Sequence, residues 1–197
     1  MVKLFSIAVL YRTPTNAMKL AAAYDLMSFG FFQRSSAQEF MSFSAKLVTE
    51  RTDPGTRQSI KQGDHMCHCY VRTDNLAAVV ISDGEYPTRV AHSLLMQVLE
   101  EFTKKIPAGD WASGKEVNYP VLETTLAKYQ NPKEADSLAK MQADLDETRI
   151  IMHNTIEAVL QRGEKLDDLV SKSQNLSDTS KMFYKTAKKT NSCCNWV

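Results

Sequence analysis

The 197-residue sequence has no long hydrophobic run, only seven glycines and six prolines, and four cysteines. Its longest apolar stretches, such as Leu76 to Ile81, are far shorter than the roughly 18 residues that a membrane-spanning helix needs. It also lacks a strong excess of charge. The formal net charge of +1 gives no reason to expect nucleic acid as a partner.

Catalytic signatures are missing as well. The sequence contains no Gly-rich phosphate loop, no nucleophile elbow and no paired carboxylates in a defined context. An acyltransferase using Cys67 or Cys193 would need a positioned base, which the sequence does not provide, although self-acylation at a cysteine stays open. We therefore expect a protein that is not an enzyme and has no cofactor.

The N-terminus and the cysteines indicate a cellular compartment. The first 16 residues alternate like a strand and lack a convincing cleavage site, which argues against a signal peptide. Val2 excludes N-myristoylation. Four cysteines in two close clusters, without a secretory signal, predict free thiols in a reducing compartment. The expected location is the cytosol.

The composition, 43% hydrophobic and 24% charged, supports one core of about 100 to 150 residues with an appendage. Alternating apolar residues and turn dipeptides predict strands over 2–11, 17–27, 56–62, 65–73 and 76–82. The alanines of 17–27 would also suit a helix, but a short hairpin connection favours a strand. Helices are expected over 38–51, 88–106 and 121–130, with a polar loop over 108–120. Ser36 and Glu39 have capping-box spacing before the first helix.

This order of elements predicts an α+β fold, one sheet with helices packed on it, ending at a boundary near Asn131-Pro132. In the fourth strand His65, Cys67 and Cys69 share one face and would place three zinc-binding side chains together. Neighbouring positions on that face are only about 7 Å apart, however, and no fourth ligand recurs at metal-site spacing. We favour small buried core residues there and predict no metal.

From residue 138 to residue 190 a 3,4 spacing continues without a break, which predicts a coiled coil. The seam positions are Leu138, Met141, Leu145, Thr148, Met152, Thr155, Val159, Arg162, Leu166, Leu169, Ser173, Leu176, Ser180, Phe183, Ala187 and Thr190. The stripe is narrow, polar residues dilute it, and Gly163 costs about 1 kcal/mol relative to Ala. Such a helix should form only when partner helices complete its core.

Arg162 is the most informative residue of the seam. Val159 and Leu166 flank it, so assembly would remove its guanidinium from water, at a cost of several kcal/mol without acceptors. Glutamine amide oxygens on partner helices would satisfy its donors. Two simpler interpretations are that the seam is the buried face of an intramolecular helix, and that Arg162-Gly163 is a turn between two shorter helices. The unbroken phase across this pair favours the coiled coil.

The stretch from Asp146 to Lys189, centred on "LQRGEKLDDLV", resembles the SNARE motif of an R-SNARE, with Arg162 as the ionic-layer arginine. With "SIAVLYR" and "EYPTRVAHSLLMQVLEEF" near the N-terminus, the chain is similar to longin-type R-SNAREs, in particular to the lipid-anchored type without a transmembrane segment. The resemblance implies a profilin-like longin domain at 1–131, with a five-stranded sheet and helices on both faces. A linker at 132–137, the SNARE motif at 138–190 and a lipidation tail at 191–197 would follow.

The same resemblance implies function and partners. The motif would zip with three Q-SNARE helices, Qa, Qb and Qc, into a parallel four-helix bundle that docks and fuses vesicles in endoplasmic reticulum, Golgi, endosomal or vacuolar traffic. NSF and alpha-SNAP would disassemble the bundle. The rival hypothesis is a coiled-coil adaptor or tether that does not drive fusion, for which a buried arginine in the seam is unnecessary.

The tail suggests a lipid anchor. Cys194 lies where a prenylation signal places its cysteine, for farnesyl or another prenyl group, and Cys193 beside it is a candidate for palmitoylation. Two lipids anchor stably where one does not, and the lysines 181, 185, 188 and 189 would favour an anionic leaflet. The sequence departs from the usual signal, because Asn195 and Trp196 replace aliphatic residues before Val197. Cytoplasm and the cytosolic face of Golgi, endosomal and vesicle membranes are the expected locations.

The first helix carries more apolar surface than one sheet contact requires. Phe40, Phe43 and Leu47 form one stripe. We hypothesise that part of this surface, with Phe43 as the leading candidate, lines a groove that holds the SNARE segment or the prenyl chain in a closed cytosolic state. The alternative is that Phe43 is an ordinary core residue.

Overall fold

A computed structural model of the chain describes residues 3–131 and 149–193. The strands are β1 (Leu4–Arg12), β2 (Ala17–Tyr24), β3 (Arg57–Gln62), β4 (His65–Val71), β5 (Leu76–Asp83) and β6 (Ile150–His153). The helices are α1 (Arg34–Glu50), α2 (Thr88–Lys105), α3 (Ala108–Trp111), α4 (Val121–Lys128), α6 (Leu166–Lys172) and α7 (Asp178–Cys193), with 3-10 turns at Phe31–Gln33 and Ile156–Val159.

The strands form one sheet in the order β2-β1-β5-β4-β3-β6. The pairs among β1 to β5 are antiparallel, whereas β6 lies parallel to β3. The five strands predicted for the N-terminal domain are therefore present, and the segment 17–24 is a strand as expected. The sixth strand was not predicted, because it comes from the middle of the expected coiled coil.

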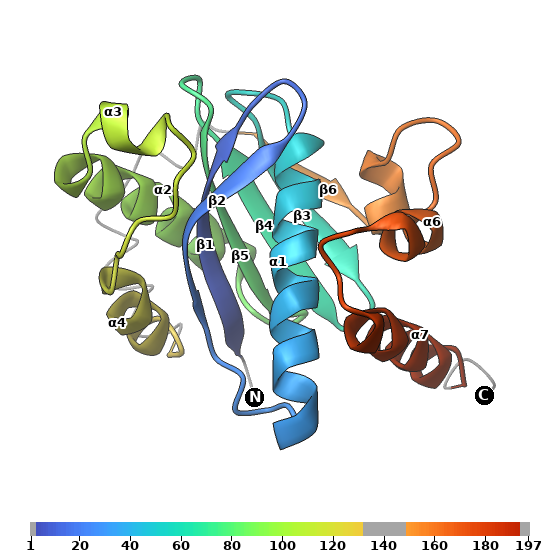
Figure 1. The fold of residues 1–197 in the computed structure, drawn as a ribbon. Coiled ribbons are helices and arrows are strands. Elements are labelled where there is room, and N and C mark those ends of the chain that lie inside the picture. The colour runs from blue at the N-terminus through green and yellow to red at the C-terminus, as the bar shows by residue number, and fades with distance from the viewer. Residues whose placement is uncertain (1–2, 132–148, 194–197) are drawn as a thin grey trace.

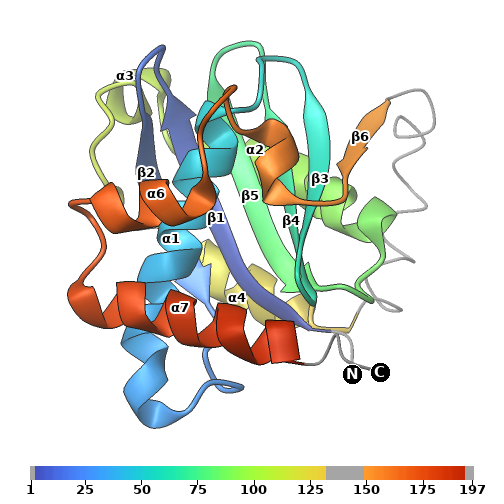
Figure 2. The same cartoon turned by 90° about the vertical axis from the view of Figure 1, so that its right-hand side faces the viewer.

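Helices cover both faces of the sheet (Figure 1). On one face lie α2, α3 and α4. On the other face lies α1, and α6 and α7 lie outside it, so that α7 crosses α1 (Figure 2). The chain after the linker thus covers the α1 side, and we call residues 149–193 the C-terminal segment.

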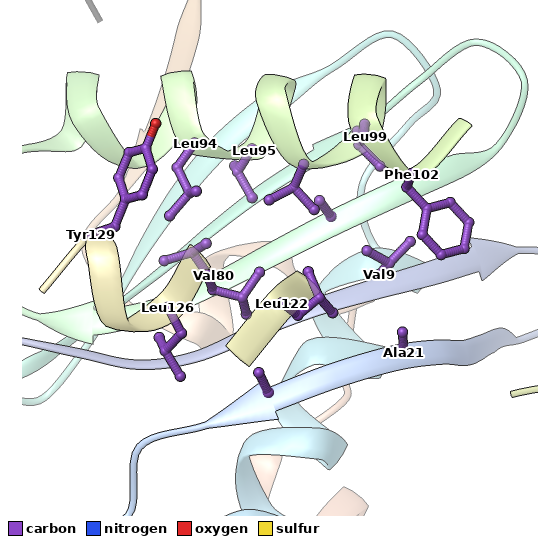
Figure 3. Close-up of a cluster of buried hydrophobic side chains, with 14 of the residues drawn as sticks. Val9, Ala21, Val80, Leu94, Leu95, Leu99, Phe102, Leu122, Leu126 and Tyr129 are labelled. Carbon is purple, nitrogen blue, oxygen red and sulfur yellow. The ribbon is translucent and has the colours of Figure 1, made fainter. Parts of the chain in front are cut away.

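The core under α2 and α4 is built from one face of the strands (Figure 3). Leu94 and Phe102 of α2 and Leu122 of α4 pack over Val9 and Val80, and all five are almost fully buried. Alternate strand residues point to this face because side chains alternate across a strand. Each such side chain contributes about 1.5 to 3 kcal/mol through burial.

The second core lies under α1 and includes part of the C-terminal segment. Val48 of α1 packs over Ile60 and Val79 of the sheet. The segment adds five buried apolar side chains to the same cluster: Ile156, Leu166, Val170, Leu176 and Tyr184. It therefore shares a core with the N-terminal domain.

Two local expectations were wrong. The first helix begins at Arg34 and not near residue 38, because the 3-10 turn Phe31–Gln33 leads directly into it. Ser36 is buried inside the helix and forms no capping box, and no side chain caps this helix at Gln33. The stretch expected to be a loop contains the one-turn helix α3, which places Trp111 against the ring of Tyr11 at a centroid separation of 5.5 Å.

Cys67 and Cys69 occupy the positions favoured by the sequence, as buried side chains of β4 in the second core. Burial raises the pKa of both thiols, that of Cys69 to about 11. They are therefore neutral thiols at physiological pH and poor nucleophiles.

Candidate functional site

The C-terminal segment joins the sheet through its first strand. Residues Ile150 to His153 of β6 pair with Arg57 to Ile60 of β3. Their side chains contribute little, since Ile151 and Met152 are 38% and 57% exposed. Backbone hydrogen bonds of the β3 edge therefore hold this part of the segment, as in peptide recognition by strand addition.

The chain then turns at Arg162-Gly163. Gly163 has a φ of +88°, a left-handed conformation that favours glycine and interrupts any helix at this point. Arg162 is exposed to solvent. Beyond the turn, the carboxylate of Glu164 accepts hydrogen bonds from the backbone N–H of Gln161 at 2.9 Å and from Nη2 of Arg51 at 2.8 and 3.0 Å. These contacts lower the pKa of Glu164, the Gln161 bond most strongly.

Helix α6 is attached by an apolar stripe and by one carboxylate. Leu166 and Val170, one turn apart, are buried in the second core. On the outer side Asp167 accepts hydrogen bonds from the hydroxyl of Tyr184 at 2.7 Å and from Nζ of Lys188 at 2.6 and 2.8 Å. Lys188 contributes most to lowering the pKa of Asp167. These bonds join α6 to α7.

Helix α7 lies across α1. Leu176, which precedes the helix, and Ser180 and Tyr184 within it are buried along one line of four-residue steps. The ring of Tyr184 stacks on Phe40 with centroids 5.3 Å apart. Phe183 meets Phe29, in the loop before α1, edge to face at 6.4 Å. The contact is mainly aromatic.

Glu39 of α1 holds the beginning of α7. One of its oxygens, Oε2, accepts hydrogen bonds from the backbone N–H of Ser177 at 3.0 Å, from its hydroxyl at 2.9 Å and from the hydroxyl of Ser180 at 2.7 Å. Ser177 in turn caps the helix, because its Oγ accepts the N–H of Ser180. The bond from Ser177 N–H contributes most to lowering the pKa of Glu39. A carboxylate at a helix N-terminus also complements the helix dipole.

An apolar cavity of about 320 Å³ remains between α1, β3, β4 and α7. Its walls include Phe29, Phe40, Met41, Cys67, Ile156 and Phe183. This is at the lower end of the size range of small-molecule sites, and its lining suits part of a hydrocarbon chain. Because α7 supplies one wall, the cavity exists only while the segment is attached.

The predicted groove residues separate into two roles. Phe40 lines the cavity and stacks on Tyr184. Phe43 and Leu47 do not line it. Phe43 packs, half-buried, against the second core, and Leu47 is buried in that core.

The predicted seam residues are distributed unevenly over the attached segment. Those buried against the N-terminal domain are Leu166, Leu176 and Ser180. Those partly buried are Val159, Leu169, Ser173 and Phe183, and those exposed are Met152, Thr155, Arg162 and Ala187. Leu138, Met141, Leu145 and Thr148 lie outside the described residues, as does Cys194, while Thr190 and Cys193 are described only as backbone within α7.

Several site residues were missed by the sequence reasoning. Glu39 was assigned to a cap on its own helix, and Arg51, Asp167 and Tyr184 were not singled out. Tyr184 could have been found from the four-residue steps Leu176, Ser180 and Tyr184, which describe a second apolar line beside the seam. Nothing in the local pattern around Arg51 indicates its partner Glu164, which is 113 residues away.

The N-terminal domain is longin-like, and its α1 face binds a following segment that carries the seam of an R-SNARE. Together these two features define the class of longin-type R-SNAREs. Two family models match the chain: Longin, described as a regulated-SNARE-like domain, over residues 26–126, and Synaptobrevin over residues 137–197. The chain belongs to the synaptobrevin homologues with a longin domain, which act in vesicle fusion in secretory traffic.

Curated relatives match over nearly their whole length. The chain is 52% identical over 193 residues to "Synaptobrevin homolog ykt6" of Schizosaccharomyces pombe, with 98% of each chain covered. It is 48% identical over 196 residues to "Synaptobrevin homolog YKT6" of Debaryomyces hansenii and 47% identical over 196 residues to that of Yarrowia lipolytica, again with 98% of each chain covered. Among residues 3–131 and 149–193, no helix has the length and apolarity that a bilayer crossing requires.

Proposed function

We propose that the chain alternates between a closed form, with its SNARE segment on the longin domain, and a SNARE bundle with one Qa, one Qb and one Qc helix. The observation that carries the proposal is that Leu166, Leu176 and Ser180 are seam positions and are also buried against the longin domain. One side chain cannot fill both cores. Closure and full zippering therefore exclude each other, and the longin domain competes with the Q-SNAREs for the segment.

Arg162 has a distinct part in this exchange. It lies in solvent in the closed form, so closure carries no cost for burying its charge. In the bundle it would lie in the central layer, where glutamine oxygens of the three partner helices accept its donors. Residues 162 and 163 would then have to change from a turn into helix, which supports the view that assembly requires the segment to detach.

We further propose that palmitoyl at Cys193 and prenyl at Cys194 attach the chain to the cytosolic face of Golgi, endosomal and vesicle membranes. The apolar cavity under α7 supports a closed cytoplasmic pool in which the prenyl chain is shielded from water. NSF and alpha-SNAP would return assembled chains to this pool. Family membership supports SNARE partners and trafficking membranes in general, and these particular lipids and partners belong to the proposal.

The test compares the full chain with its fragment 132–197, each mixed with Qa, Qb and Qc helices. We expect both to give an SDS-resistant complex of four helices, and the fragment to assemble faster because nothing sequesters its seam. Homodimers of the fragment that ignore the Q-SNARE helices would instead indicate a coiled-coil adaptor or tether. Equal assembly rates for fragment and full chain would remove the inhibitory role of the longin domain.

A further inference from the structure

The loop between β2 and α1, residues 26–33, presents apolar side chains to solvent that the fold does not use. Phe32 is 91% exposed, Phe31 76% and Met27 75%. These are the three most exposed large hydrophobic side chains among the described residues. Single exposed hydrophobics are common, but three within six residues form a patch of the kind that marks a protein or membrane contact.

The loop is an ordered structure. The N–H of Phe29 bonds to the carbonyl of Leu26 at 3.1 Å, and the N–H of Gln33 to that of Gly30 at 2.8 Å. Phe29 points inward and meets Phe5 at 5.9 Å, which anchors the loop, while the rings of Phe31 and Phe32 meet edge to face at 5.5 Å. Two aromatic rings are thus held outward on a tight turn.

Two cations border the loop that carries this aromatic pair. Nζ of Lys3 donates to the hydroxyl of Ser28 at 2.7 Å, and Nε of Arg34 donates to the carbonyl of Phe29 at 3.3 Å. The guanidinium of Arg34 also lies 6.0 Å from the ring centre of Phe31. One cation therefore lies at each end of the loop, where a partner that covers the rings would contact it.

Two carboxylates close to the loop in sequence, Asp25 and Glu39, are hydrogen-bonded. Asp25 accepts the N–H of Met27 at 3.0 Å and an N–H of the Gln130 side chain at 3.3 Å. Glu39 is bound to Ser177 and Ser180. These donors are uncharged, so both carboxylates keep their negative charge and offset the charges of Lys3 and Arg34. The excess of positive charge beside the loop therefore comes from the lysines of α7, and it favours an anionic partner.

Helix α7 extends the same surface. Its Phe183 contacts Phe29, and Lys185 and Lys189, two and six residues further along the helix, are exposed. In Figures 1 and 2 the loop before α1 forms the lower end of the molecule and α7 crosses α1 just above it. Cys193 is ten residues after Phe183, which corresponds to about 15 Å of helix and keeps the loop close to any lipid carried at the end of α7.

We propose that the loop 26–33 is a membrane-contact element of the closed chain, in which Phe31 and Phe32 enter the interface of an anionic bilayer and Lys3, Arg34 and the α7 lysines bind its headgroups. Protruding rings bordered by cations are suited to a soft, negatively charged surface. A protein partner would need a shaped apolar rim around the rings, whereas here Arg34 lies beside Phe31 and Lys3 beside Ser28. Aromatic insertion combined with basic residues is the usual physical basis of interfacial binding.

The test uses the full chain made in bacteria, which carries no lipid, and flotation with two kinds of vesicle. We expect binding to phosphatidylcholine mixed with phosphatidylserine and much weaker binding to phosphatidylcholine alone. The double variant Phe31→Thr, Phe32→Thr should bind the mixed vesicles at least about tenfold more weakly, because two apolar rings no longer leave water. The control is Ile151→Thr, which changes an exposed apolar side chain on β6 outside the predicted seam and should bind as the unmodified chain does.

A second measurement reports depth directly. In a Trp196→Phe background, where Trp111 stays buried in both variants, Phe32→Trp in mixed vesicles should be quenched by brominated lipid and Ile151→Trp should not be. Equal flotation of the loop variant and the unmodified chain, or no flotation of either, would overturn the proposal. So would self-association in the ultracentrifuge that depends on Phe32 without vesicle binding, because the loop would then be a protein surface.

This inference rests on the proposed function in one respect only: the proposed attachment to trafficking membranes brings the closed chain near a bilayer. Both variants remain outside the buried contacts between the C-terminal segment and α1, so their unfolding midpoint should not change. Assembly of the loop variant with Q-SNARE helices, measured in solution, separates the two proposals. If the loop variant assembles normally but no longer floats with vesicles, the membrane proposal is supported. If the unmodified chain itself fails to assemble, that result counts against the SNARE proposal alone.

Discussion

The ring of Tyr184 in α7 stacks on the ring of Phe40 in α1, with centroids 5.3 Å apart and planes inclined by 27°. Tyr184 is only 7% exposed, and its hydroxyl donates to Asp167 of α6. Burial raises the pKa of Tyr184 well above its usual value, so it remains a protonated donor at physiological pH. One side chain thus connects three helices, and it belongs to the SNARE segment without being a seam residue.

Tyr184→Ala should therefore open the closed form while leaving the seam intact. Loss of the buried ring and of its hydrogen bond should weaken closure by about 2 kcal/mol, or roughly thirtyfold in the equilibrium constant. Spin labels at Ser35 and Lys185, both exposed, would show this as a shift from a short to a broad distribution of distances. Met182→Ala is the control, because Met182 is 68% exposed and should leave the distances unchanged. A short, narrow distribution in the Tyr184 variant would show that the aromatic stack does not maintain closure.

Glu39→Ala should loosen the start of α7. The three hydrogen bonds to Oε2 cap the helix from outside, and their loss should cost about 1 kcal/mol, partly reduced by solvent screening. Hydrogen exchange of the amides from Asp178 to Lys181 should accelerate about fivefold. The exchange rates in Glu39→Gln should lie between those of the unmodified chain and those of Glu39→Ala, since glutamine keeps an acceptor without the charge. Gln38→Ala, at the exposed neighbouring position, should have no effect on these amides.

The direction of the pKa shift of Glu39 determines how this contact depends on pH. The pKa of Glu39 is lowered in the closed form, so its contribution is fully present above the ordinary value of 4.5 and is lost as pH falls through the lowered value. Between pH 5 and pH 8 the exchange rates of the α7 amides, corrected for intrinsic rates, should therefore show no titration from Glu39. A step within that range would assign the contact to another group.

Most of the N-terminal fold could be predicted because its signals are local. The continuous apolar run from Leu76 to Ile81 and the turn at Asp74-Asn75 define a buried strand and its start, and Asn75 does adopt a left-handed φ of 67°. The start of α1 was wrong because a capping pattern at Ser36 and Glu39 was given more weight than the 3-10 turn before it. Tertiary contact determined the role of Glu39, whose partner Ser177 is 138 residues away.

The site could be predicted only in part, because one amphipathic segment carries two overlapping apolar lines. The 3,4 spacing through Leu176, Ser180 and Phe183 describes the predicted bundle. The steps from Leu176 to Ser180 and Tyr184 describe the contact with α1. A periodic pattern defines a face without identifying its partner. The sequence therefore indicated that the segment needs a partner, and not that β6 would pair with the edge of the sheet.

The longin domain should lose stability as pH falls below 7. The hydroxyl of Ser59 lies 2.8 Å from Nδ1 of His68 and 2.9 Å from Nε2 of His92, and all three side chains are fully buried. Burial lowers the pKa of His68 to about 4 and that of His92 to about 3, with the nearby His68 and Arg57 adding to the effect on His92. Both imidazoles are neutral in the fold and take up protons on unfolding below pH 6.5.

Their contribution is thus fully present above pH 6.5 and declines toward pH 4. Between pH 7 and pH 5 the free energy of unfolding should fall by roughly 2 to 4 kcal/mol. Urea denaturation at the two pH values measures it. His92→Gln, which still offers Ser59 a hydrogen-bonding group, should remove about half of the difference, and His153→Gln on β6 should not change it. A pH-independent unfolding free energy would mean that the pair is protonated without loss of the fold.

The contact between Arg51 and Glu164 allows the longin domain to be tested as a brake on assembly. Arg51 belongs to the longin domain, has no place in the bundle seam, and binds the residue that follows the Arg162-Gly163 turn at 2.8 and 3.0 Å. The two side chains are 18% and 25% exposed, so the pair is partly shielded from solvent and should contribute about 1 kcal/mol to closure.

Arg51→Ala should accelerate assembly of the full chain with Q-SNARE helices about fivefold, because the open form becomes more populated. Arg51→Lys should recover part of the delay, and neither change can affect the fragment 132–197, which lacks residue 51. An unchanged assembly rate for Arg51→Ala would place the rate-limiting release elsewhere, at β6 or at α7, and assembly slower than that of the unmodified chain would contradict a competition between the longin domain and the Q-SNAREs.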